Sequence, residues 1–115
     1  MNFELSEEQQ AFADSVARFA REKLAAGALK RAHSTEWPWD AAELIARQGL
    51  MGIAFPEEDG GQGGTLMHAV LAIQQVALVC PRSADIVQVG NFGPLRTFVE
   101  YASPEQKARF LPDLL

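Results

Sequence analysis

The stretch from Thr65 to Cys80 contains no Asp, Glu, Lys or Arg, and this feature restricts the folds open to the chain more than any other. Placed on a helix, its apolar residues cover almost the whole circumference instead of one side. Neighbouring elements must enclose such a helix, because water would otherwise meet its apolar surface. We therefore expect residues 65 to 79 to form the central and most buried helix of a bundle.

Two capping patterns mark further helix starts. Ser6 and Ser103 each precede a glutamine by three residues, an arrangement in which both side chains satisfy free backbone N–H groups. Between these points the apolar residues recur at helical spacing, and no run alternates as a strand would. The sequence therefore predicts an all-α fold, a bundle of about five to six helices that forms one domain over residues 1–115.

Glycine and proline positions predict where these helices end. Gly27 is expected to end the first helix. Pro38 suits the first position of a short second helix, and Gly49 suits the left-handed residue after its end. Glycines and a proline at residues 90 to 94 predict a kink or break within the apolar segment 83–101.

A glycine-rich loop, Gly60 to Gly64, lies just before the uncharged helix. Glycine loops at helix starts can bind phosphate through backbone N–H groups. Here three carboxylates, Glu57 to Asp59, precede the glycines, and their charge would repel phosphate. We therefore favour a tight connection between helices that needs positive φ angles.

Composition excludes several classes of protein. Ten Lys and Arg against fifteen Asp and Glu give a net charge of −5, which disfavours nucleic acid and anionic membranes as partners. The single cysteine, Cys80, and a start without a secretory pattern favour a cytoplasmic location. Neither His33 nor His68 has a partner at metal-ligand spacing, so no metal site is expected.

Three segments in a fixed order carry a resemblance to a known family. They are Leu5–Gln10, Gly49–Gly64 and Glu105–Pro112. Together they resemble the N-terminal helical domain of the acyl-CoA dehydrogenase family over nearly the whole chain. Members of that family continue into a β-domain and a second helical domain.

The resemblance implies an enzyme that oxidises the Cα–Cβ bond of an acyl-CoA thioester. In the family a glutamate removes the α-proton, FAD accepts the β-hydride, and an electron-transfer flavoprotein reoxidises the cofactor. The base and most FAD contacts lie in the other domains, so no catalytic residue is assigned here. We expect the 115-residue chain alone to be inactive and to bind FAD weakly at best. The resemblance also implies a homotetramer or homodimer.

The resemblance further implies that this domain walls the cavity for the acyl chain. The corresponding positions are Asp85, Ile86, Val89, Phe92 and Gly93. An alternative stays open, because the apolar members of this set have the spacing of plain core residues.

Other functional readings also stay open at this stage. Acyl-CoA oxidases and flavin-dependent monooxygenases share similar helical domains, and a non-catalytic interaction module is a third reading. Arg96 could meet a polar acyl tail, or it could form a surface pair with Glu100, four residues on. Trp37 and Trp39 are expected to fasten the second helix to its neighbour, with stacking against a ligand as the alternative.

Overall fold

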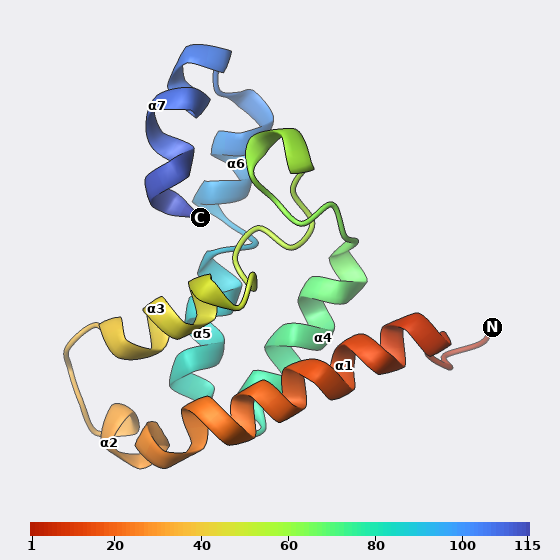
Figure 1. Ribbon diagram of the computed structural model, residues 1–115, viewed down its shortest axis with the longest axis vertical. Helices are drawn as coiled ribbons and strands as arrows, with labels where there is room; N and C mark the ends of the chain where they lie inside the picture. Colours follow the sequence, from red (N-terminus) through yellow and green to blue (C-terminus); the bar gives the residue numbers. More distant parts are fainter.

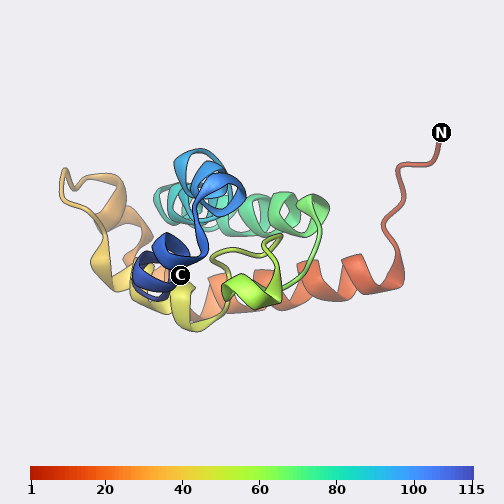
Figure 2. The same cartoon turned by 90° about the horizontal axis from the view of Figure 1, so that it is seen from above.

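The computed structural model describes residues 1–115, and it contains helices and no strand. The all-α prediction is therefore confirmed. The helices form two layers, with α1, α3 and α7 in one layer and α4, α5 and α6 in the other (Figures 1 and 2). The molecule measures 42 × 40 × 21 Å, so it is a slab only two helices thick.

The structure has seven α-helices and three short 3-10 or π segments, and the longest connection, residues 48–65, joins α3 to α4. The α-helices are α1 (Glu7–Phe19), α2 (Ala28–Ala32), α3 (Trp39–Arg47), α4 (Leu66–Ala77), α5 (Pro81–Val89), α6 (Pro94–Tyr101) and α7 (Pro104–Leu114). The other segments are the π segment η1 (Ala20–Leu24) and the 3-10 turns η2 (Ala25–Gly27) and η3 (Glu57–Asp59).

The main hydrophobic core lies between the two layers. It joins α1, α3, α4 and α5 through large side chains such as Phe19, Ile45, Val76 and Ile86. A second, smaller core of Phe55, Val99 and Leu111 fastens α6 and α7 to the loop after α3. The C-terminal helices therefore attach to the rest of the domain through a loop and not through the main core.

The local signals for helix starts are confirmed. Ser6 and Ser103 both form complete capping boxes. Thr65 forms a third, in which the side chain of His68 accepts from the Thr65 N–H as glutamine does in the other two. The loop glycines Gly60 and Gly63 have positive φ, as the tight connection requires. The break before α6 is also present, because α5 ends at Val89 and α6 starts five residues later.

The prediction that the first helix ends at Gly27 is wrong. Helical backbone continues from α1 through η1 and η2 into α2, a short helix that the sequence did not predict. Gly27 has φ −98°, which any residue can adopt, so it does not act as a left-handed stop. Its missing Cβ instead makes room for Arg31, because a Cβ there would lie 2.8 Å from the guanidinium.

The expectation that α4 is enclosed on every side is also wrong. The helix does pack against both α1 and α5. However, Leu66, Met67, Val70 and Leu78 form an exposed stripe, with Leu78 76% accessible to water. In a slab two helices thick, each helix keeps one face outward. No helix of the chain is both long and apolar enough to cross a membrane.

Candidate functional site

An apolar groove of about 870 Å³ lies where α3, α5, α6 and the end of α7 meet. Eleven of its fifteen lining residues are hydrophobic, and a volume of this size is typical of pockets for small molecules. On α3, Trp39, Ala42 and Ala46 line it because residues three, four and seven positions apart share one helix face. On α5, Ile86 and Val89 do the same. The groove therefore suits a flexible, uncharged ligand.

The structure brings only part of the predicted residue set to this groove. Ile86 and Val89 line it, Ile86 buried and Val89 49% exposed. Phe92 instead packs against the main core. Asp85 is exposed on α5, and Gly93 is exposed in the break before α6. Neither of them is among the lining residues, so the geometry supports Ile86 and Val89 as the residues to test.

The two tryptophans do not fasten α3 to its neighbour. Trp39 is 75% exposed and Trp37 is 43% exposed, and their rings meet edge to face with centroids 6.3 Å apart. Both line the groove. The packing prediction for them is therefore wrong: in this chain they form an aromatic rim, as amphipathic rings at binding sites often do.

Few charges face the groove. Glu43 and Asp113 are the charged residues among its lining, and Glu43 is paired with Arg47 through the exposed side of α3. Arg96 forms an ion pair with Glu100, with Nε 3.2 Å from Oε1, so the surface-pair reading of this residue is confirmed. No lining residue is a cation.

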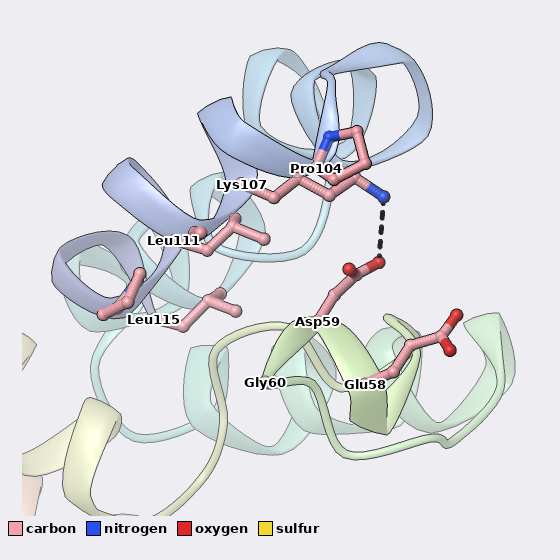
Figure 3. Close-up of a pocket in the computed structure, with 9 residues that line it drawn as sticks. Glu58, Asp59, Gly60, Pro104, Lys107, Leu111 and Leu115 are labelled. Carbon is pink, nitrogen blue, oxygen red and sulfur yellow. Dashed lines mark hydrogen bonds and ion pairs between the residues drawn. The ribbon is translucent and has the colours of Figure 1, made fainter.

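A second hollow, of about 780 Å³, lies between η3 and α7 (Figure 3). Lys107 crosses it and donates to Asp59 over 3.2 Å, while Leu111 and Leu115 approach the hollow from the side of α7. Lys107, the cation of this hollow, is already paired with Asp59. Leu111 belongs to the second core, and Leu115 packs against that core. The contacts across this hollow therefore attach α7 to the loop.

Asn91 is a completely buried residue that follows Gly90, one of the residues lining the groove. Its amide Nδ2 donates to the carbonyls of Leu50 (2.8 Å) and Val87 (2.7 Å), and its Oδ1 accepts from the N–H of Ile53 (2.6 Å). Both N–H groups of the amide and one of the two lone pairs of Oδ1 are thus in use. Asn91 thereby fixes the turn after α3 against the end of α5.

Arg31 is the only buried charged residue, at 8% exposure, and it lies away from the groove. Its guanidinium donates to Leu24 O (2.7 Å), to Asp40 Oδ2 (3.1 Å) and, more weakly, to Cys80 Sγ (3.7 Å). Burial alone would lower the pKa of Arg31, but the hydrogen bonds to Asp40 and Cys80 and the charge of these groups outweigh it and raise the pKa. The hydrogen bond from Arg31 in turn lowers the pKa of Asp40. This cluster holds α2 to the starts of α3 and α5.

Cys80 is completely buried beside this cluster. Its burial would raise the pKa of the thiol, but hydrogen bonds from Ser83 and Arg31 lower it overall. The Ser83 hydroxyl donates to Sγ over 3.0 Å. Because no part of this side chain reaches water, the thiol serves as a packed hydrogen-bond acceptor.

The Arg31–Asp40 pair predicts acid sensitivity. The folded-state pKa of Asp40 lies below its unfolded value of about 3.9, so its stabilising effect is present above that pH and is lost as pH falls through the folded value. Asp40→Asn should therefore lower the thermal midpoint at neutral pH, and its difference from the parent should shrink as the pH falls through the folded pKa of Asp40. The effect should be modest, because Asp40 is largely exposed.

Thermal midpoints measured from about pH 2 to 7 test this prediction. Asp85→Asn is the control, because Asp85 is an exposed carboxylate for which the structure gives no ion pair. A difference between parent and Asp40→Asn that stays constant over the whole pH range would contradict it.

Comparison with known proteins places this fold in a family. Residues 6–115 match the model of the acyl-CoA dehydrogenase N-terminal domain. The chain belongs to the acyl-CoA dehydrogenase family, and it corresponds to the N-terminal domain of such proteins.

Individual relatives carry different names. A 3-sulfinopropanoyl-CoA desulfinase of Paraburkholderia xenovorans is 34% identical over 91% of this chain and 27% of its own length. A probable acyl-CoA dehydrogenase, YngJ, of Bacillus subtilis is 40% identical over 70% of this chain and 21% of its own length. An acryloyl-CoA reductase (NADH) of Anaerotignum propionicum is 31% identical over 99% of this chain and 29% of its own length.

The chain therefore spans between a fifth and a third of the length of these relatives. Their names share one feature, a CoA thioester, and differ in the reaction. The fold and the family are shown by the match, whereas the reaction has to be argued from the site.

Proposed function

We propose that this domain acts within an FAD-dependent acyl-CoA dehydrogenase, an enzyme that oxidises the Cα–Cβ bond of an acyl-CoA thioester. In this proposal the groove between α3, α5 and α6 forms one wall of the cavity that holds the acyl chain. Ile86 and Val89 are the wall residues that both the family resemblance and the groove support.

The observation that carries the proposal is the apolar lining of the groove. Each methylene of an acyl chain that leaves water for such a surface gains about 0.8 kcal/mol. The groove has no cation among its lining residues, so it offers no ion-pair partner to a ligand with an anionic tail. An alkyl chain is therefore the ligand that matches this surface in a protein of this family.

The glycine-rich loop of this chain does not fit the phosphates of FAD. In the loop from Gly60 to Gly64, every backbone N–H already donates to a carbonyl of the same loop region. Gly61 donates to Pro56, and Gly64 donates to Ile53. No free N–H group remains there for a phosphate, and the carboxylates before the loop add repulsion. We therefore assign FAD binding to parts of the enzyme outside these residues.

The remaining partners follow from the same proposal. An electron-transfer flavoprotein would accept the electrons, and the enzyme would be a homotetramer or homodimer. The cytoplasmic location expected from the sequence stays a prediction, which cell fractionation can test.

The test is anaerobic mixing of the complete enzyme with saturated acyl-CoAs of several chain lengths. We expect the flavin absorbance to bleach and a 2-enoyl-CoA product to form, with slow reoxidation by oxygen and fast reoxidation by an electron-transfer flavoprotein. Rapid reoxidation by oxygen would favour an acyl-CoA oxidase, and substrate hydroxylation would favour a monooxygenase. Absence of bound flavin and of any turnover would favour the non-catalytic module.

A second measurement uses the 115-residue chain alone. We expect it to show no dehydrogenation and no better than weak FAD binding, because its loop N–H groups are occupied. Flavin that co-purifies with this chain in equal amount would contradict the assignment of FAD to other parts of the enzyme.

A further inference from the structure

We propose that Met51 sets the length of the acyl chain that the groove accepts, and that Gly90 and Asn91 position it for this role. This proposal rests on the proposed function of the groove. Met51 lines the groove and also packs, half buried, against the main core. Its side chain therefore separates the groove from the core beneath and forms the floor of the groove.

The backbone around Met51 is held firmly on both sides. Leu50 O accepts from Asn91 Nδ2 (2.8 Å), Gly52 N donates to Gly90 O (2.8 Å), and Ile53 N donates to Asn91 Oδ1 (2.6 Å). These three hydrogen bonds tie the turn to the end of α5, which also carries Val89. The floor and the wall of the groove are thus fixed to each other.

The side chain of Met51 lies directly on Gly90. A Cβ at Gly90 would be 2.3 Å from Sδ and 2.4 Å from Cε of Met51, far closer than atoms can approach. The glycine is therefore needed for the thioether to lie low in the groove. Methionine is unbranched and flexible, so a small push from below would move it into the space of the ligand.

This geometry predicts opposite effects for two substitutions. Met51→Ala removes the floor and should deepen the groove by the space of about two methylenes. Gly90→Ala adds a methyl under the thioether and should raise the floor. We expect the ratio of kcat/KM for long over short acyl-CoAs to rise roughly tenfold in Met51→Ala and to fall by a similar factor in Gly90→Ala.

The double variant tests whether the two residues act through each other. With alanine at position 51 there is no thioether for the new methyl to displace. We therefore expect Met51→Ala with Gly90→Ala to have a long-to-short ratio close to that of Met51→Ala alone, a strongly non-additive result. If Met51→Ala fails to fold, Met51→Val removes less volume and should change the ratio in the same direction by less.

Two controls separate this effect from general destabilisation. Met67→Ala truncates a methionine on the exposed face of α4, outside the groove. Gly61→Ala inserts a methyl 2.3 Å from the carbonyl oxygen of Phe55, a clash at the same distance outside the groove but with backbone instead of a flexible side chain. We expect Met67→Ala to keep the parent ratio, and Gly61→Ala to lower the thermal midpoint without changing the ratio.

The complete enzyme is used throughout, and calorimetric binding of saturated acyl-CoAs is measured beside turnover. An unchanged ratio in Met51→Ala or Met51→Val, or a Gly90→Ala defect that persists in the double variant, would overturn the role of Met51. If the parent binds acyl-CoAs with the predicted chain-length changes but catalyses no dehydrogenation, only the proposed reaction fails. If the parent binds no acyl-CoA, both proposals fail.

Discussion

Asn91→Leu is expected to lower the free energy of unfolding by about 3 to 5 kcal/mol. Leucine has nearly the same shape, but it leaves two buried carbonyls and one buried N–H without their present partner. Each such loss costs about 1 to 3 kcal/mol. The affected groups are the carbonyls of Leu50 and Val87 and the N–H of Ile53. Asn91 is completely buried, so water cannot replace the lost hydrogen bonds.

The loss is measured as the thermal midpoint of the helical circular dichroism signal, which should fall by at least about 10 °C. Asn2→Leu is a matched control, since Asn2 is the only other asparagine and lies exposed at the N-terminus. Its midpoint should stay within about 2 °C of the parent. Equal midpoints for Asn91→Leu and the parent would show that the hydrogen bonds of Asn91 do not hold the turn.

Val89→Trp is expected to reduce relative kcat/KM for long acyl-CoAs by roughly two orders of magnitude in the complete enzyme. The indole would fill the part of the groove that three or four methylenes would otherwise occupy, at about 0.8 kcal/mol each. Short acyl-CoAs should react nearly as fast as with the parent. Because Val89 is about half exposed, the larger side chain has room to enter the groove without overpacking the core.

The matched control is Val70→Trp on the outer face of α4. Val70 is 50% exposed, against 49% for Val89, but it does not line the groove. This variant should leave the chain-length profile unchanged. If Val89 instead served only as a core residue, Val89→Trp would lower the thermal midpoint and reduce activity on every chain length alike. That outcome would remove Val89 from the site.

Helix starts could be predicted from the sequence because their causes are local. A capping box such as that of Ser6 needs only residues within one turn, and the same holds for Ser103. Gly49 has the predicted positive φ and is followed by buried Leu50 for a similar reason. The all-α class and the family resemblance both rest on such short segments in a fixed order.

The groove could be predicted only in part, because it joins segments that are far apart in the chain. Ile86 and Val89 were expected from the family resemblance, and the structure places both of them in the lining of the groove. Met51 was not predicted, and Trp39 was assigned to packing because the sequence does not show that its ring is exposed beside the alanine face of α3. The break after Val89 turns Phe92 towards the core, and no local rule gives the angle of such a break.

The amino-acid sequence by itself determined the all-α class, the caps of the helices that begin after Ser6, Thr65 and Ser103, the positive φ of Gly49 and the family resemblance, since each depends on neighbours within a few residues. The tertiary structure decided which faces meet. It exposed one side of uncharged α4 because the slab is two helices thick, and it buried Arg31 because Gly27 leaves room for the guanidinium. Burial depends on packing between distant segments, and a helical pattern alone does not say which partner covers which face.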